Sequence, residues 1–267
     1  MEDNKCFDYL VVLLVYRNVE DLVDFFRFSK LQNSKIIVIN SFYDKISESI
    51  FRKIAEDNDA DFLSVPNKGY GYGNNVGINY ALRHYNFNYL IVSNADIIVD
   101  KIEIDSLKKY GDAIIAPKIL NLSGKNQNPS SPFTPGIFLE WMKYLCYKRC
   151  LRKMIYLIYA YSRLSKMVYY LISDIKKTVF SAHGAFVIFP YPIVKRLYPF
   201  YNEEMFLFNE EEHLGRLAKE KGISTIYAPE IVIRHKEDGS MNVASIDLFE
   251  RMRQSYLVYY KYWKNRI

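Results

Sequence analysis

The residues of this chain best suited to chemistry are ionisable side chains that stand where apolar runs end. The run at residues 89–96 (YLIVSNAD) closes on Asp96, and the run at residues 225–235 (TIYAPEIVIRH) closes on His235. Three consecutive glutamates, at 210–212, follow the apolar sequence MFLF. An aspartate at the carboxyl end of a strand lies where α/β sheets bind their ligands. Carboxylates and imidazoles there can bind a cation or move a proton.

A glycine-rich segment precedes the Asp96 run. Residues 67–75 read NKGYGYGNN, and residues 76–85 continue with helical spacing. Glycines let a backbone come close to a ligand, and the asparagine amides can read a base or a ribose. The order of loop, helix, strand and acidic residue therefore suits the binding of a nucleotide and its metal ion.

Apolar strands and amphipathic helices alternate through the first half of the chain, which predicts a parallel, doubly wound sheet. We expect strands at 8–16, 35–40, 61–66 and 89–96, and helices at 19–30, 47–58 (with Ser47 as N-cap) and 76–85. Later elements are a strand at 113–120, a strand pair or one long strand at 178–190, a helix at 205–222 and a strand at 225–235. The stretch 122–136, rich in Ser, Asn and Pro, predicts a loop over an active site.

Composition sets the broad class. The 267 residues, half of them apolar, suffice for one domain with an appendage. We expect a nucleotide-binding half (1–120), a second half (121–240) and a C-terminal helix (241–267). Three cysteines and the absence of an apolar leader favour the cytoplasm. Cys146 and Cys150 are interpreted as structural thiols rather than zinc ligands.

Residues 138–177 form a distinct basic and aromatic block, predicted to be a helical insertion. Its part from 140 to 177 carries nine basic side chains against two acidic ones. We expect this part to lie on an anionic membrane surface. The alternative is an insertion whose cations only face water, and no reader motif favours nucleic acid. The basic residues are Lys143, Lys148, Arg149, Arg152, Lys153, Arg163, Lys166, Lys176 and Lys177.

Several motifs follow one another in a recognisable order. They are VVLLVYRNVEDL (11–22), PNKGYGYGNNVGINYAL (66–82), VSNADI (92–97), SAHGAFVIF (181–189), YNEEMFLFNEEEHLGRLAKEKG (201–222) and YAPEIVIRH (227–235). In this combination the chain resembles family 2 glycosyltransferases of the GT-A fold. The branch it resembles, often called rhamnosyltransferase-like, builds bacterial surface polysaccharides. The resemblance runs from Tyr9 to about Ser240, apart from the basic block. It implies an α/β fold with a mostly parallel, twisted, Rossmann-type sheet flanked by helices.

The resemblance implies a divalent cation, Mn²⁺ or Mg²⁺, which would relieve the charge that grows on a diphosphate leaving group. The D-x-D-like element of the family matches Asn94, Ala95 and Asp96, so an amide replaces the first carboxylate. Asp96 is expected as the direct metal ligand or as the organiser of its water. His235 matches the position where a histidine completes the metal site.

A general base is also implied, because inversion by a single displacement requires a proton acceptor on the acceptor side. Glu211 matches the usual position of the base, with Glu210 in reserve, and His213 replaces an aspartate of the family. The alternative is that the glutamates only favour the positive end of a helix dipole.

The resemblance also implies which residues contact the donor and which line the pocket. Asn40 could instead be a simple turn residue, and His183 could be a satisfied core histidine. The expected donor contacts are Tyr16, Asn40, Asn67, Gly69, Asn74, Asn94 and Asp96, and the expected pocket residues are His183, Gly184 and His213.

The resemblance thus predicts an inverting glycosyltransferase that moves a sugar from a nucleoside diphosphate to a lipid-linked saccharide acceptor. The product would belong to the assembly of a capsule, an exopolysaccharide or a cell-wall polysaccharide. We expect it at the inner face of the plasma membrane, without nucleic acid, and a homo-oligomer is left open. The alternative is an inactive saccharide-binding or scaffolding homologue, suggested by Asn94 and His213. A nucleotidyltransferase would need a basic glycine-rich loop near the first strand, which RNVEDL is not.

Overall fold

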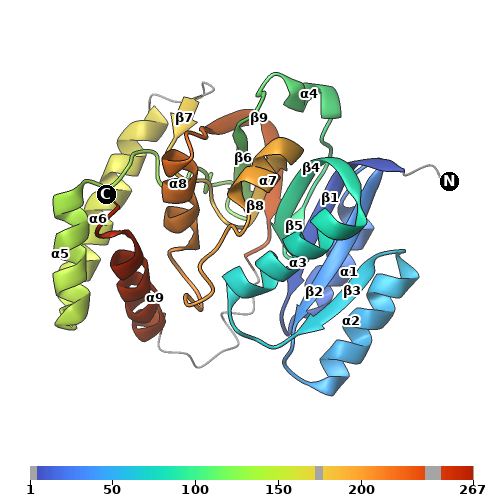
Figure 1. The fold of residues 1–267 in the computed structure, drawn as a ribbon, viewed down its shortest axis with the longest axis horizontal. Coiled ribbons are helices and arrows are strands. Elements are labelled where there is room, and N and C mark those ends of the chain that lie inside the picture. Colours follow the sequence, from blue (N-terminus) through green and yellow to red (C-terminus); the bar gives the residue numbers. More distant parts are fainter. Residues whose placement is uncertain (1–4, 172–176, 238–247, 267) are drawn as a thin grey trace.

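In the part of the chain that the structure describes, a nine-stranded sheet with helices on both faces forms the centre of the molecule (Figure 1). The computed structural model describes residues 5–171, 177–237 and 248–266. The strands are β1 (Cys6–Val15), β2 (Ser34–Ser41), β3 (Asp61–Val65), β4 (Asn86–Asn94), β5 (Ile97–Ile98), β6 (Ile114–Asn121), β7 (Lys177–Val179), β8 (Phe186–Pro190) and β9 (Thr225–His235). The helices are α1 (Val19–Phe28), α2 (Lys45–Asp57), α3 (Tyr70–His84), α4 (Ile104–Lys108), α5 (Ile137–Lys148), α6 (Arg152–Leu171), α7 (Tyr191–Leu197), α8 (Glu210–Glu220) and α9 (Leu248–Trp263).

The sheet confirms the predicted α/β fold class and refines it. Its order is β3-β2-β1-β4-β8-β6-β9-β5, with β7 paired to β9. The strands from β3 to β4 are parallel, as their alternation with helices requires. Beyond β4 the pairs β4–β8 and β8–β6 are antiparallel, whereas β6–β9 is parallel. The second half is therefore more mixed than the sequence predicts, because β8 does not follow β4 through a helical crossover.

Side chains of the central strands enter two separate cores. Leu10 and Val12 of β1 pack with α3, α8 and α9 on one face, whereas Val11 and Leu13 pack with α1, α2 and α4 on the other. Burial on both faces explains why β1 reads as a continuous apolar run.

Gly73 of the predicted loop and Gly77 of the predicted helix after it serve helix packing. α3 begins at Tyr70, inside the stretch that the sequence assigns to the loop, so most of NKGYGYGNN is helical. A Cβ atom at Gly73 would stand 2.6 Å from Leu14 Cδ1, and one at Gly77 would stand 2.4 Å from Val12 Cγ1. These glycines therefore bring α3 close to β1. Gly69 precedes the helix with a φ of 110°, a conformation that favours glycine.

Several boundaries differ from the sequence predictions. Asp44, not Ser47, is the N-cap of α2: its Oδ1 accepts from the Ser47 N–H at 2.7 Å. α8 begins at Glu210, several residues after the predicted start. The 178–190 segment forms two strands, but they do not pair with each other, because β7 joins β9 and β8 lies between β4 and β6.

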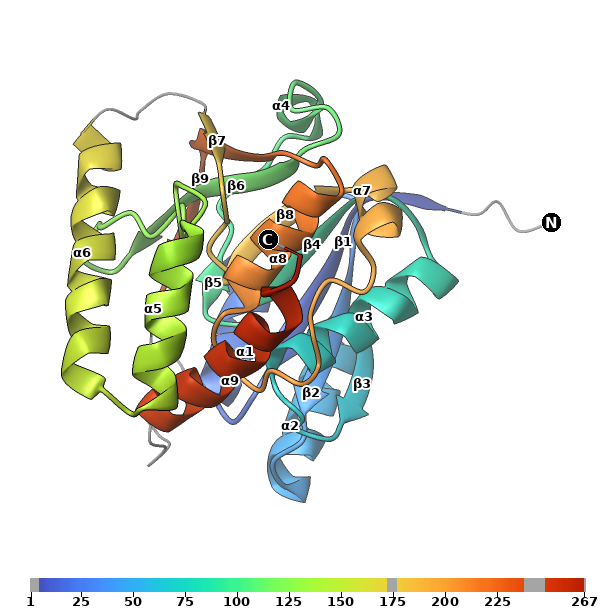
Figure 2. The ribbon, with the colours of Figure 1, turned by 60° about the vertical axis from the view of Figure 1, so that its left-hand side comes forward.

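The predicted insertion forms a helical hairpin at one end of the molecule. Figures 1 and 2 show α5 and α6 there, with α5 beside the C-terminal helix α9. Tyr144 of α5 stacks on Tyr260 of α9 with ring centroids 4.3 Å apart. Lys177 belongs to β7, while Lys176 and the 241–247 part of the predicted C-terminal helix lie outside the described residues. Among the helices described, none is both long and apolar enough to cross a membrane.

Candidate active site

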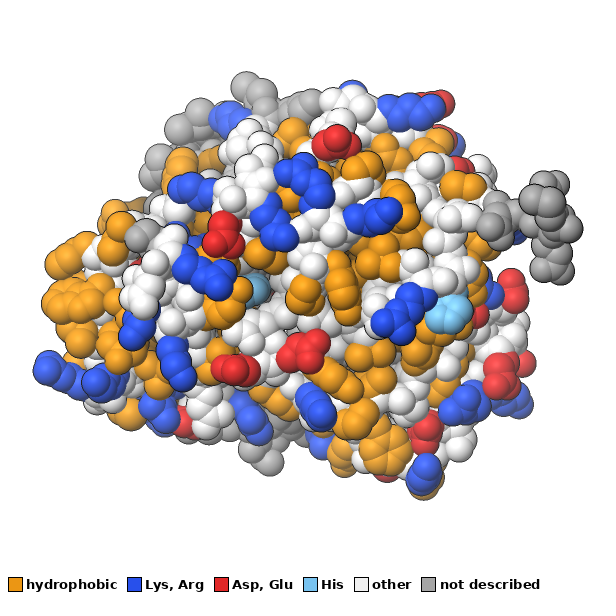
Figure 3. Space-filling model, viewed as in Figure 1, with side chains coloured by type: hydrophobic (Ala, Val, Ile, Leu, Met, Phe, Trp, Pro, Cys, Tyr) orange, Lys and Arg blue, Asp and Glu red, His pale blue; other side chains and the backbone are white. Residues whose placement is uncertain are grey.

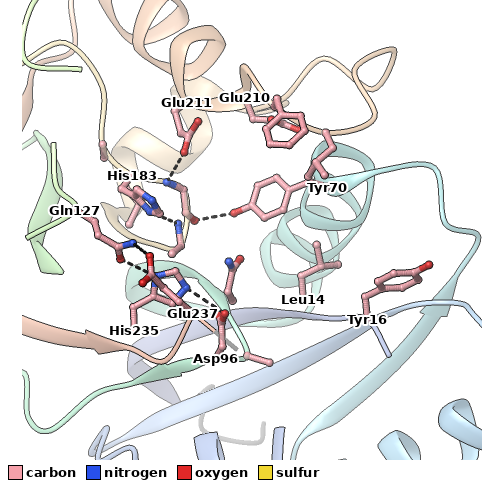
Figure 4. A pocket seen from close by; sticks show the side chains of 18 of the residues that line it. Leu14, Tyr16, Tyr70, Asp96, Gln127, His183, Glu210, Glu211, His235 and Glu237 are labelled. Carbon is pink, nitrogen blue, oxygen red and sulfur yellow. Dashed lines mark hydrogen bonds and ion pairs between the residues drawn. The ribbon is translucent and has the colours of Figure 1, made fainter. Parts of the chain in front are cut away.

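A cavity of about 490 Å³ opens beyond the carboxyl ends of β1 and β4. Parallel strands direct their carboxyl ends to the same edge, where α/β sheets bind ligands. Figure 4 shows polar side chains from both halves of the chain facing this space. The predicted site residues that line it are Tyr16, Asn94, Asp96, His183, Gly184, Glu210, Glu211 and His235.

One end of the cavity holds Asp96 and His235. Pairing of β5 with β9 sets Ile97 opposite His235, which brings the aspartate and the histidine together across 139 residues of sequence. Asp96 Oδ2 lies 3.1 Å from His235 Nε2. Asp96 Oδ1 is buried and has no hydrogen-bond partner among the described residues. We call this pair the aspartate–histidine end.

Behind His235 lies a polar chain that the sequence does not predict as part of the site. His235 Nδ1 is 2.7 Å from Gln127 Oε1, and Gln127 Nε2 donates to Glu237 Oε1 at 2.6 Å. Gln127 and Glu237 both line the cavity. The sequence contains only weak signals that these two residues belong to the site: Gln127 lies in the loop predicted over the site, and Glu237 follows His235 by two positions.

The other end of the cavity is formed by the first turn of α8, which carries Glu210 and Glu211. The Gly184 N–H donates to Glu211 Oε1 at 3.1 Å, and Tyr70 Oη donates to the Gly184 carbonyl at 2.8 Å. The backbone at Gly184 is thus held between α3 and α8. We call this part the glutamate end.

Glu210 sits in an apolar setting with a second carboxylate beside it. Its side chain is buried against Tyr70 and Tyr201, and its Oε1 has no hydrogen-bond partner in the part of the chain that the structure describes. Burial, and then the charge of Glu211, raise the pKa of Glu210 to about 8. At neutral pH Glu210 therefore keeps its proton, which leaves a single negative charge on the pair.

His183 lies between the two ends. Its backbone N–H donates to Asn128 Oδ1 at 3.0 Å, and its Nδ1 accepts from the Ala185 N–H at 3.2 Å. The His183 and His235 rings approach edge to face, with centroids 5.9 Å apart. Figure 4 shows the His183 ring facing the cavity. Because Nδ1 accepts a hydrogen bond, the neutral His183 ring carries its hydrogen on the other nitrogen, which can act as a donor in the cavity.

Four of the predicted donor contacts do not line the cavity: Asn40, Asn67, Gly69 and Asn74. Asn40 is buried at the end of β2 and donates to Ser64 Oγ at 3.1 Å. Asn74 is buried within α3, and its amide nitrogen donates one turn back in the same helix at 3.1 Å. Gly69 packs beneath a neighbouring backbone, and Asn67 is half-buried. Their contact with a donor stays a prediction.

His213 faces away from the cavity. It is buried, and its Nδ1 accepts from Trp263 Nε1 at 3.1 Å. Burial, with a smaller effect from Arg266, lowers the pKa of His213 to about 4. The reason is helical geometry: two positions beyond Glu211, a side chain points to a different face of α8. His213 therefore joins the contact between α8 and α9.

Comparison with known proteins supports the fold. No family model matches the chain. A stretch of 128 residues is 30% identical to the low-salt glycan biosynthesis hexosyltransferase Agl10 of Haloferax volcanii, covering 46% of this chain and 40% of that protein. This chain thus spans less than half the length of the curated relative.

Two solved structures are similar at low sequence identity. Residues 1–349 of S. aureus TarS align with a TM-score of 0.54 and 9% identity over 97% of this chain and 73% of that one. GalNAc-T7, solved with UDP, GalNAc and Mn²⁺, aligns with a TM-score of 0.56 and 11% identity over 88% of this chain and 44% of that one. The chain therefore has the predicted GT-A fold, a central mixed sheet flanked by helices.

Proposed function

We propose that this protein transfers a sugar from a nucleoside diphosphate to a saccharide acceptor, with inversion at the anomeric carbon. The observation that carries the proposal is that the aspartate–histidine end and the glutamate end face one cavity. One end can bind a cation and a diphosphate, while the other can accept a proton. Similarity to a hexosyltransferase over part of the chain supports the same reaction class.

The aspartate–histidine end fits a divalent cation, Mn²⁺ or Mg²⁺. Asp96 offers a buried oxygen without a hydrogen-bond partner among the described residues, and His235 turns Nε2 towards the same carboxylate. The described residues hold no group of three or more His, Cys, Asp or Glu side chains arranged for a metal. Two protein ligands suit a cation that also binds water and substrate phosphates. When bound, the cation would neutralise charge on the departing diphosphate.

Glu211 is the base in this proposal. The acceptor hydroxyl oxygen forms a bond to the anomeric carbon as the bond from that carbon to the diphosphate oxygen breaks. The bonding electron pair leaves with the diphosphate, and the hydroxyl proton passes to the Glu211 carboxylate. Glu210 remains protonated and uncharged beside it, since the pKa of Glu210 is raised to about 8. The division into a donor half (1–120) and an acceptor half (121–240) stays part of this proposal.

Turnover of a panel of sugar nucleotides with Mn²⁺ tests the reaction. Glu211→Gln should lower turnover by about 10²- to 10⁴-fold, because the proton acceptor is lost. Glu212→Gln is the matched control: Glu212 lies on the same helical turn but does not line the cavity, so turnover should persist. If the wild-type protein releases no nucleotide from any donor, the alternative gains support, namely a saccharide-binding homologue without catalysis.

A second feature, the outer face of the α5–α6 hairpin, bears on where the reaction occurs. Large apolar side chains on both helices and on the turn between them are 40–69% exposed. Figure 3 shows such a group over α5 at the edge of the molecule, with Lys and Arg side chains next to it. The exposed apolar residues are Ile137, Phe138, Trp141, Leu151, Met154, Tyr156, Leu157, Tyr161, Leu164 and Met167.

The charge on this hairpin has one sign at the surface. Its exposed cations include Arg149, Arg152 and Lys153. The acidic residue among its described positions, Glu140, is buried and pairs with Arg216 at 2.7 Å. A second copy of the chain docked on this face would bring like charges together, whereas an anionic lipid surface would complement both the cations and the apolar side chains.

We therefore propose that α5 and α6 lie on an anionic membrane, at the inner face of the plasma membrane, where a lipid-linked saccharide can reach the cavity. Reversing Arg152 and Lys153 to Glu should lower binding to phosphatidylglycerol vesicles by about 10-fold or more, at about 1 kcal/mol for each basic residue near the surface. Phosphatidylcholine vesicles should bind weakly in either case.

Charge reversal of Arg52 and Lys53, exposed on α2 at the opposite end of the molecule, is the matched control and should leave vesicle binding unchanged. Unchanged binding after reversal of Arg152 and Lys153 removes the membrane proposal. A dimer in solution that is lost on Leu157→Ser would assign the face to a second copy of the chain instead.

A further inference from the structure

A chain of polar side chains leads from His235 to a carboxylate at the rim of the cavity. Figure 4 shows Gln127 in contact with both His235 and Glu237. The distances are 2.7 Å from His235 Nδ1 to Gln127 Oε1 and 2.6 Å from Gln127 Nε2 to Glu237 Oε1. The second oxygen of Glu237 accepts from Asn121 Nδ2 at 2.9 Å. Asn121 stands opposite His235 in the β6–β9 ladder.

Hydrogen-bond chemistry fixes the direction of every bond in this chain. A carboxylate only accepts, so the amides of Gln127 and Asn121 must both turn their NH₂ groups towards Glu237. Asn121 confirms the direction independently, because its Oδ1 accepts from the Lys125 N–H at 2.9 Å and from Ser123 Oγ at 2.8 Å. Gln127 must then present its oxygen to His235, and the Nδ1 of His235 must carry the hydrogen.

On the far side of the His235 ring, these bond directions leave Nε2 without a hydrogen. A neutral imidazole with its hydrogen on Nδ1 has a lone pair on Nε2. That lone pair faces Asp96 Oδ2 at 3.1 Å, so two acceptors oppose each other. Asp96 Oδ1 is also without a hydrogen-bond partner in the described part of the chain. A cation between the two groups would satisfy both, whereas a hydrogen on Nε2 would occupy the same position.

We infer that Gln127, itself oriented by Glu237, is a positioning residue that holds His235 in the tautomer whose Nε2 can bind a divalent cation together with Asp96. The inference rests on the proposed function for the identity of the cation. Partners of this kind behind a histidine ligand orient the ring and raise its basicity, and their loss typically weakens metal binding by about 10- to 100-fold.

The test reads the histidine directly in metal-free protein. At mildly alkaline pH, where imidazoles are neutral, long-range ¹H–¹⁵N NMR of imidazole-labelled protein should show the hydrogen of His235 on Nδ1. In Gln127→Leu the hydrogen should move to Nε2, where Asp96 accepts it. Titration with Mn²⁺, followed by the EPR signal of the free ion, should show about 10- to 100-fold weaker binding in this variant.

A paired exchange separates positioning from mere packing. Gln127→Glu combined with Glu237→Gln reverses the amide and the carboxylate, but it keeps an oxygen facing His235 Nδ1 and a donor for the bond between positions 127 and 237. This double variant should restore the Nδ1–H tautomer and Mn²⁺ binding to within about threefold of wild type, a smaller change than the 10-fold loss typical of a missing partner. Gln254→Leu is the matched control, since Gln254 makes a similar bond to Glu250 at 2.9 Å on α9.

The outcomes distinguish this inference from the proposed function. A wild-type His235 with its hydrogen on Nε2, or on both nitrogens, overturns the inference even if the enzyme is active. An Nδ1–H tautomer that survives Gln127→Leu overturns it as well. If the tautomer responds as expected but Mn²⁺ does not bind, even with a nucleoside diphosphate present, positioning by Gln127 stands and the metal part of the proposed function fails.

Discussion

The two ends of the cavity use the same functional group in different surroundings. At the aspartate–histidine end, Asp96 keeps one oxygen without a hydrogen-bond partner among the described residues, while the histidine beside it is held by a chain of polar side chains. At the glutamate end, Glu210 lies among tyrosines, and burial raises its pKa to about 8. The surroundings thus suit one carboxyl to a cation and keep the other one protonated.

The two ends also differ in how they are supported. Asp96 and His235 stand at the ends of strands that are neighbours in one sheet. Glu210 and Glu211 stand on α8, which is tied to the helical layer through Arg216. Its guanidinium binds Glu140 Oε2 at 2.7 Å and Tyr259 Oη at 2.9 Å, and that hydroxyl donates to Glu140 Oε1 at 2.7 Å. Separate supports mean that each end can be perturbed while the other remains in place.

The largest expected effect separates the chemistry of the two ends. Asp96→Asn should lower turnover by about 10³-fold and weaken Mn²⁺ binding by more than about 10-fold, because a charged ligand is lost. Glu211→Gln should lower turnover similarly yet leave Mn²⁺ binding unchanged. Metal titration of both variants measures the difference, and Asp100→Asn, at an exposed carboxylate, is the control. Equal loss of Mn²⁺ binding in both variants would contradict two distinct roles.

The support of the glutamate end gives the next largest effect. Glu140→Gln should lower the free energy of unfolding by about 3–5 kcal/mol, because it leaves the buried Arg216 without its counter-charge. Urea unfolding measures this loss. The double variant Glu140→Leu with Arg216→Met removes both charges and should be close to wild type in stability. Similar losses in the single and double variants would contradict this explanation, because the loss would then not come from the uncompensated charge of Arg216.

The raised pKa of Glu210, about 8, makes folding depend on pH. The folded state holds a proton that the unfolded state releases near pH 4.5, so stability should fall as pH rises from about 4.5 to about 8. Glu210→Gln has no proton to lose, so its stability should not fall over this range. Between pH 5 and pH 8 the variant should therefore gain on the order of 3 kcal/mol of stability relative to wild type. Urea unfolding at both values tests this, with Glu212→Gln as control. Parallel pH profiles would mean that Glu210 is charged.

The lowered pKa of His213 leads us to expect a smaller change of stability with pH, in the opposite direction. Its pKa is lowered to about 4 in the folded state, so the unfolded chain binds an extra proton below about pH 6.5. Stability should therefore fall as pH drops from about 6.5 towards 4, by on the order of 2 kcal/mol. Thermal unfolding of His213→Gln should lack this acid slope, while the exposed control His84→Gln should keep it. An unchanged slope in His213→Gln would place the acid sensitivity elsewhere.

Much of the fold follows from local pattern. The apolar runs and helical spacings predict the strands from β1 to β4 and the helices between them, because strand and helix periods are written in neighbouring residues. The same reasoning places Asp96 and His235 at strand ends, since an apolar run stops where a strand leaves the core. The spacing of the glycines, by contrast, does not show what they contact: Gly73 and Gly77 allow α3 to pack closely on β1 rather than allowing a ligand to approach the backbone.

The sequence by itself determined the α/β class, the residues that close the central strands and the basic hairpin, because each depends on residues close together in the chain. Only the tertiary structure decided which of them meet. The β5–β9 register joins Asp96 to His235, the loop between β6 and α5 adds Gln127, and the turn of α8 sends His213 away from the cavity. Contacts between distant segments depend on strand register and helix rotation, and these are fixed only when apolar faces from the whole chain pack against one another.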